Sequence, residues 1–154
     1  MSTTERAKEI RTQLKRQHGW NSRQVSVRAK YFSMGSSIDV RINDPAVPIA
    51  PVEKIAHAHE SISRCEYSGE ILSGGNRYVS VSYDHEALKA RALPYLPAVT
   101  AALAQATGSA LIPVEGTKFM IGRDQFDRPQ LWADHYLATA HSAEGLAETI
   151  ATQA

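Results

Sequence analysis

Apolar residues at the start of the chain recur every three or four positions, as they do on one side of an amphipathic helix. The residues of this stripe are Ala7, Ile10 and Leu14. Thr3 or Thr4 is placed to cap the first turn, and Gly19 is placed to end the last one. We therefore predict a helix over residues 4–17 that packs through its apolar stripe.

The next two segments alternate apolar and polar residues, which is typical of strands with one buried face. Residues 24–31 turn Val25, Val27, Ala29 and Tyr31 to one side and Gln24, Ser26, Arg28 and Lys30 to the other. After a turn over residues 33–36, the alternation continues with Ile38, Val40 and Ile42. Two such strands are expected to form an antiparallel hairpin with one solvated face.

Beyond the hairpin the pattern predicts further helices and strands. These are a helix from Pro51 to about Cys65, a strand over 77–83, a helix over 85–106, strands over 110–114, 118–123 and 130–138, and a helix to about Thr152. Asp84 and Ser142 are placed to cap the last two helices. Pro94 and Pro97 interrupt the helix over 85–106, so we expect a break there.

These elements predict an α+β fold: an antiparallel sheet with helices packed on one face, plus a C-terminal β-hairpin and short helix. The length of 154 residues and the hydrophobic content of 43% suit a single domain over residues 1–154. Within that domain we expect a module over residues 1–106 and a hairpin–helix extension over residues 107–154.

The chain shows no sequence feature of an exported or membrane protein. No apolar run approaches the ~20 residues that span a bilayer, and no secretory signal is recognisable at the N-terminus. The lone cysteine, Cys65, cannot form an internal disulfide. We expect a cytoplasmic protein that contacts no membrane and needs no cofactor.

Charge is distributed unevenly along the chain. The net charge is only +1, yet residues 1–42 contain nine basic and three acidic side chains, and the remainder contains eight basic and thirteen acidic ones. Such an asymmetry is typical of a surface that meets an acidic partner, nucleic acid included, although a solvated face has the same composition. The candidate binding residues are Lys8, Arg11, Lys15, Trp20, Arg28, Lys30, Arg41, Asn76 and Arg77.

The geometry expected for these residues separates them into two groups. Lys8, Arg11 and Lys15 form a stripe on the first helix, which packs on the inner face of the sheet. Arg28, Lys30 and Arg41 belong to the outer face, where they could follow phosphates while Trp20 and Phe32 stack on bases. One continuous patch is therefore not assured by the sequence.

The loop Gly74-Gly75-Asn76-Arg77 has two interpretations. Its glycines let backbone amides approach an anion, and Arg77 adds a positive charge. However, the loop lacks the spacing of phosphate-binding motifs and precedes a strand instead of a helix. We favour a tight connection that needs a positive φ.

Histidines and acids in the sequence predict neither a metal site nor a catalytic group. His57 and His59 lie two positions apart, and on a helix such residues point about 200° apart. Asp134 and His135 are neighbours on an expected strand and point to opposite faces. No nucleophile accompanies them, so we expect a protein without catalytic activity.

The aromatic residues of the C-terminal segment are typical either of a protein-binding surface or of a core. They include Phe119, Phe126, Trp132 and Tyr136, with Met120, Ile121, Leu131 and Leu137 among them. Both interpretations stay open at this point.

Two stretches carry a resemblance in addition to a pattern. VSVRAKYFSMGSSIDVR at residues 25–41 and CEYSGEILSGGNRYV at residues 65–79 resemble a small α+β module of the large-polyvalent-protein-associated domains, over about residues 5–84. The most specific parts are the Gly35-Ser36-Ser37 turn and the Gly74-Gly75-Asn76 loop. Such modules occur in long proteins of phages and conjugative elements and as short free-standing proteins, so the resemblance implies a mobile-element setting without implying catalytic residues.

Three functions are expected from these observations. The first is a phage or plasmid accessory protein that binds and inhibits a host defence or DNA-processing protein. The second is direct binding of DNA or RNA through the N-terminal basic residues. The third is an enzyme whose site is not recognisable in one sequence.

Overall fold

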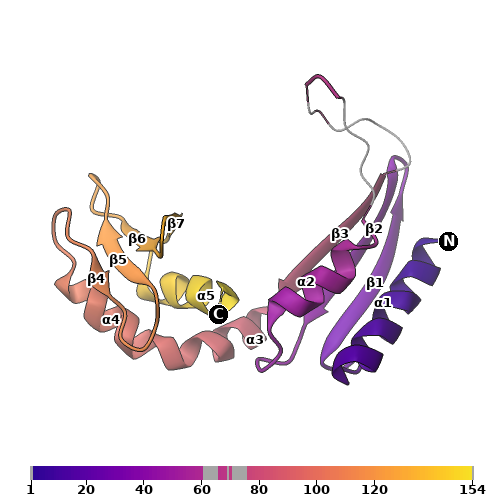
Figure 1. The fold of residues 1–154 in the computed structure, drawn as a ribbon, viewed down its shortest axis with the longest axis horizontal. Coiled ribbons are helices and arrows are strands. Elements are labelled where there is room, and N and C mark those ends of the chain that lie inside the picture. The colour runs from indigo at the N-terminus through magenta and orange to yellow at the C-terminus, as the bar shows by residue number, and fades with distance from the viewer. Residues whose placement is uncertain (1, 61–65, 69, 71–75, 154) are drawn as a thin grey trace. The chain divides into compact units, whose positions relative to one another are not determined.

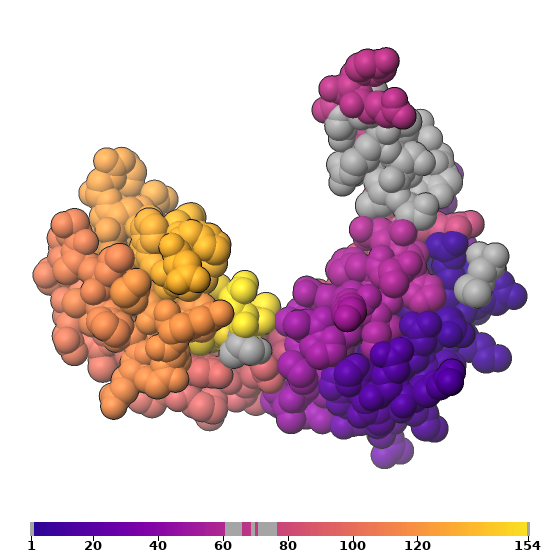
Figure 2. Space-filling view, in the orientation of Figure 1, coloured from indigo at the N-terminus to yellow at the C-terminus, as the bar shows by residue number. Residues whose placement is uncertain are grey.

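The computed structural model describes residues 2–60, 66–68, 70 and 76–153, with only the backbone of Asn76. The chain divides into two compact units, Met1–Ala87 and Leu88–Ala154, which are described separately (Figure 1, Figure 2). The first unit holds α1 (Thr3–His18), β1 (Val25–Phe32), β2 (Gly35–Ile42), α2 (Ile49–His57), β3 (Asn76–Tyr83) and the start of α3 (His85–Ala92).

The three strands of the first unit form one sheet with β2 in the middle. β1 and β2 pair antiparallel, as predicted, with Val27 opposite Val40. β3 runs parallel to β2, with Val79 opposite Ile38, so this sheet is mixed and not wholly antiparallel. The physical reason is the connection: α2 lies between β2 and β3 and returns the chain to the same end of the sheet, which a parallel pair requires.

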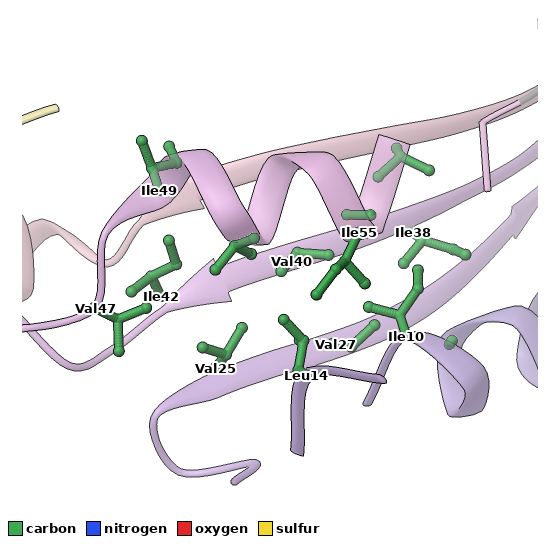
Figure 3. Close-up of a cluster of buried hydrophobic side chains, with 14 residues drawn as sticks. Ile10, Leu14, Val25, Val27, Ile38, Val40, Ile42, Val47, Ile49 and Ile55 are labelled. Carbon is green, nitrogen blue, oxygen red and sulfur yellow. The ribbon is translucent and has the colours of Figure 1, made fainter. Parts of the chain in front are cut away.

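Most of the predicted inner face of the hairpin forms the core of the first unit, whereas Tyr31, at the end of β1, is 63% exposed. Figure 3 shows Ile10 and Leu14 of α1 and Ile55 of α2 pointing toward the side chains of the sheet. The buried apolar strand residues are Val25, Val27, Ile38, Val40, Ile42 and Val79. α1 and α2 therefore cover the same face, and among the described residues of this unit no helix packs on the opposite face of the sheet.

At α1, the predicted N-terminal cap is wrong and the predicted C-terminal stop is confirmed. Ser2 caps the helix instead of Thr3 or Thr4: its hydroxyl accepts from the Glu5 amide at 3.2 Å, and the Glu5 carboxylate accepts from the Ser2 amide at 2.6 Å. Thr3 is buried within the first turn and donates to the Ser36 hydroxyl at 2.7 Å, because that side chain faces the sheet. Gly19 ends the helix in the left-handed conformation, with φ of 74°, as predicted.

Two predicted boundaries in the first unit are wrong. The turn between β1 and β2 consists of Ser33 and Met34 alone, and Gly35 and Ser36 already pair in β2. The second helix begins after Pro48 and ends at His57, because the following residues form a turn in which His59 bonds back to Ala56. Residues 61–65 of the predicted helix, with Cys65, lie outside the described residues.

The second unit contains the end of α3, η1 (Leu93–Tyr95), α4 (Leu96–Gln105), β4 (Ile112–Pro113), β5 (Met120–Arg123), β6 (Pro129–Trp132), β7 (Tyr136–Thr139) and α5 (Ala143–Gln153). The predicted break at Pro94 and Pro97 is confirmed, and Ser142 caps α5 by accepting from the Gly145 amide at 3.2 Å. The predicted strand over 130–138 is two strands, because a turn at 133–135 reverses the chain.

The four strands of the second unit form an antiparallel sheet in the order β4-β5-β6-β7. Val99 and Ala102 of α4 and Leu146 and Ile150 of α5 share its core with Ile121, so residues 88–106 belong to this unit and not to the N-terminal module. The α+β class is confirmed. Among the described residues, no helix combines the length and the apolar character needed to cross a membrane.

Candidate functional site

The outer face of the first sheet carries polar and positively charged side chains. Sheet register places on this face Ser26, Arg28, Lys30 and Phe32 of β1, Ser37, Asp39 and Arg41 of β2, and Tyr78, Ser80 and Ser82 of β3. Most positions between the long side chains are serine. The long cations therefore rise from a surface of small hydroxyl groups.

Asp39 lies in the centre of this face and organises the groups around it. Lys30 forms an ion pair with its carboxylate, and the Ser80 hydroxyl donates to the same carboxylate at 3.0 Å. The Lys30 bond lowers the pKa of Asp39 most, the Ser80 bond adds to this, and Arg41 favours the charged form at longer range. The carboxylate therefore stays ionised at neutral pH and neutralises one of the cations.

The cations line a hollow at the end of the sheet where β1 begins. Its volume is about 360 Å³, and it is lined by Ser22, Ser26, Arg28, Lys30, Asp39, Arg41, Asn43 and Asp84. Arg28 and Arg41 are exposed. The guanidinium groups of the arginines, the serine hydroxyls and the Asn43 amide in this hollow can bind an anionic ligand. The carboxylates of Asp39 and Asp84 repel such a ligand.

A second hollow of about 200 Å³ lies where α1 ends, beside the loop that enters β1. Arg11 and Lys15 supply its cations, Trp20 its aromatic ring, and Asn21 and Ser22 further polar groups. Ser22 lines both hollows. The cations of the helix and those of the sheet face thus meet at this loop, a contact that the sequence alone does not predict. We call Arg11, Lys15, Arg28, Lys30 and Arg41 the basic surface.

Two residues of the second hollow have partners within the unit. The ring of Trp20 stacks on His18 with 4.4 Å between ring centroids, and it packs against the core. The Arg11 guanidinium donates to the carbonyl of Val27, a residue of the edge strand β1. Trp20 therefore offers a ligand less ring surface than a free loop aromatic would, whereas Arg11 keeps further donors available.

Lys8 and Arg77 do not join the basic surface. Lys8 lines a separate shallow hollow beside Glu5 and Glu9. Arg77 lies opposite Ser36 in the register, on the inner face, because its parity in β3 matches that of buried Val79. The side chain of Asn76 lies outside the described residues, as do Gly74 and Gly75, so both interpretations of this loop, the favoured tight connection and the anion site, stay predictions.

Arg77 is instead close to Arg6 on the helix-covered side. Burial lowers the pKa of Arg6, and the positive charge of Arg77 lowers it further. Arg6 is held by the carbonyl of His59, to which it donates at 3.0 Å. This pair belongs to the packing of the first unit, since neither side chain lines the two hollows.

Phe32 and Tyr78 form an aromatic pair at the other end of the outer face. Their rings stack with 6.1 Å between centroids and 28° between planes. Phe32, which the sequence analysis suggested as a base-stacking residue, is the last residue of β1, and its partner Tyr78 was missed. The signal was available in the alternation of residues 77–83, where Tyr78 has the opposite parity to Val79.

The described histidines and acids that were considered as metal ligands form no metal site. Among the described residues, no three His, Cys, Asp or Glu side chains lie close enough together to share an ion. His57 lies 3.7 Å from the carboxylate of Glu60, which accepts from the Val79 amide at 3.0 Å. Asp134 and His135 are both exposed in the turn between β6 and β7.

The aromatic residues of the second unit are divided between its core and its surface. Phe119 is buried, together with Ile121 and Leu131. Phe126 and Tyr136 are exposed, at 68% and 45% of their surface. Both interpretations of this segment therefore apply, each to different residues.

Comparison with protein-family models, with curated proteins and with solved structures finds no match to this chain. The function is therefore inferred from the geometry of the outer face and from the sequence.

Proposed function

We propose that the first unit binds nucleic acid through the basic surface. The observation that carries the proposal is the junction at Ser22, where the hollow with Arg28, Lys30 and Arg41 meets the hollow with Arg11 and Lys15. A chain of phosphates needs cations spread along a path, not one deep pocket, and the two hollows provide such a path.

The chemistry of the surface suits phosphate oxygens. The guanidinium groups of Arg11, Arg28 and Arg41 present planar sets of donors that fit such oxygens in pairs, and the lysines add point charges. Hydroxyl groups of Ser22 and Ser26 lie between them in the hollows. Such contacts position a nucleic acid backbone without selecting a sequence.

The experiment that tests the proposal is a fluorescence-anisotropy titration of labelled DNA and RNA at several salt concentrations. We expect binding that weakens steeply as salt rises. The variant Arg28→Ala/Lys30→Ala/Arg41→Ala should reduce the slope of log affinity against log salt by about one to two on a single strand, because Arg28 and Arg41 each lose a phosphate contact and Lys30, which pairs with Asp39, loses at most one more.

A matched variant separates local contacts from net charge. Lys54→Ala/Lys89→Ala/Lys118→Ala removes the same charge from exposed lysines outside the basic surface. We expect this control to keep most of the affinity and the slope. Equal losses in the two variants, or no binding by the wild type at any salt, would refute the proposal.

Replacing Asp39 by asparagine is expected to strengthen binding several-fold. The carboxylate competes with phosphate for Lys30, so its removal leaves the ammonium group free to bind. Anisotropy at a fixed salt concentration measures the effect, and Glu53→Gln on α2 makes the same change in net charge away from the outer face. Unchanged or weaker binding by Asp39→Asn would mean that Lys30 does not contact the ligand.

A second candidate function is the binding of a host defence or DNA-processing protein, in the mobile-element setting that the resemblance of residues 5–84 implies. The observation that favours a protein partner is Phe126, exposed in the β5–β6 turn and covered on one side by Arg128 at 5.1 Å. The Asp124 carboxylate holds this turn by accepting from the amides of Phe126 and Arg128, both at 2.9 Å. Alanine at Phe126 should then abolish capture of the partner, while nucleic acid binding stays unchanged.

A further inference from the structure

The aromatic pair on the outer face owes its geometry to the small residues beneath it. Phe32 belongs to β1 and Tyr78 to β3, and the middle strand β2 lies between them. Strands two apart are separated by about 9.6 Å, so the rings must lean over β2 to reach a centroid distance of 6.1 Å. Gly35 and Ser37, opposite Phe32 and in register with Tyr78, leave room for this.

The pair presents one ring outward and uses the other as its support. Phe32 is 46% exposed, whereas Tyr78 is half-buried. Phe32 lies on the same face as Lys30 and two residues beyond it, about 7 Å along the strand. An apolar ring that is exposed, braced from behind and next to a phosphate-binding cation has the properties of a stacking platform for a base.

We propose that Phe32, supported by Tyr78, stacks on an unpaired base, so that the ligand of the basic surface is single-stranded nucleic acid. This inference rests on the proposed function and specifies its ligand. A base in a duplex is already stacked on both faces and offers none to a protein ring, whereas every unpaired base offers one irrespective of sequence. Duplexes are then held by phosphate contacts alone.

The test compares three labelled probes of equal length: an oligothymidylate, a strand of the same length with abasic sites throughout, and a duplex. The wild type should bind the oligothymidylate most tightly. Phe32→Ala should weaken that binding about five- to a hundred-fold, and it should leave the abasic strand and the salt slope unchanged. Circular dichroism verifies that the variant is folded.

Two further variants make the result specific. Phe32→Trp keeps a large ring and should retain binding, and its added fluorescence should be quenched by the oligothymidylate but not by the abasic strand. Phe126→Ala removes an exposed ring from the second unit and should change nothing. If all three probes bind alike and Phe32→Ala has no effect, the stacking site is refuted while the basic surface stands. If none binds, the proposed function itself fails.

Discussion

Replacing Leu14 by alanine is expected to destabilise the first unit by about 2–5 kcal/mol, the usual cost of a cavity left by a fully buried leucine. Leu14 is 1% exposed and contacts the core that α1 shares with the sheet. Ile150→Ala should cost a similar amount in the second unit, where Ile150 is fully buried in α5. Because the two cores share no residue, each substitution should act on its own unit.

The two tryptophans allow each unit to be followed separately. Trp20 packs against the first core, and Trp132 lies in β6 of the second unit. In a Trp132→Phe background, fluorescence during urea unfolding reports on the first unit, and a Trp20→Phe background reports on the second. Leu14→Ala should shift the Trp20 transition to lower urea and leave the Trp132 transition in place. Equal shifts of both transitions would show that the units unfold together.

Replacing Arg123 by alanine is expected to cost about 2–4 kcal/mol of unfolding free energy in the second unit, because bonds from a charged donor to several carbonyls are lost together. The guanidinium donates to three backbone carbonyls: those of Leu103 at 3.2 Å and Ala106 at 3.0 Å, where α4 ends, and that of Asp127 at 3.0 Å. Without it, the Ala106 carbonyl loses this donor, and the Leu103 carbonyl keeps only the longer bond from the Ala106 amide at 3.3 Å. Urea unfolding monitored by Trp132 measures the change.

Arg128→Ala is the matched control for Arg123, since it removes the same kind of side chain from the same hairpin. Arg128 is 54% exposed and bonds to Asp124 at 2.7 Å, which predicts a loss below about 1 kcal/mol. Arg123→Lys keeps the charge but not the planar set of donors, so it should restore only part of the stability. Equal costs of the two alanine substitutions would contradict the role assigned to Arg123.

The sequence pattern predicted those features of the fold that depend on residues close together in the chain. Alternation identified β1, β2 and their buried face, because one side of that hairpin is covered by helices. The proline break and the Ser142 cap were predictable because each depends on one residue's backbone chemistry. The same reasoning identified Arg28, Lys30 and Arg41 as members of one face.

The features that the sequence did not predict depend on contacts between segments that are distant in the chain. The parallel pairing of β3 follows from the path of α2. It could not be predicted, because a strand with one solvated face alternates apolar and polar residues in the same way whether it pairs parallel or antiparallel. The division after Ala87 was missed because continuous helical propensity does not show which core a helix joins. The meeting of the two basic groups at Ser22 depends on the path of a loop, and the pair of Phe32 and Tyr78 depends on the small residues of β2.

The two outer strands of the first sheet bear on how copies of the protein meet one another. A bare strand edge is a template on which another chain can add a strand, and this leads to aggregation. On β1 the Val27 carbonyl is occupied by Arg11, and on β3 the Val79 amide is occupied by Glu60. The Arg11 guanidinium occupies a hydrogen-bonding group on one edge, and the Glu60 carboxylate occupies one on the other. A second copy therefore cannot pair a strand with the sheet through these two groups. Replacing Arg11 would therefore uncover the Val27 carbonyl on this edge, in addition to removing one cation of the basic surface.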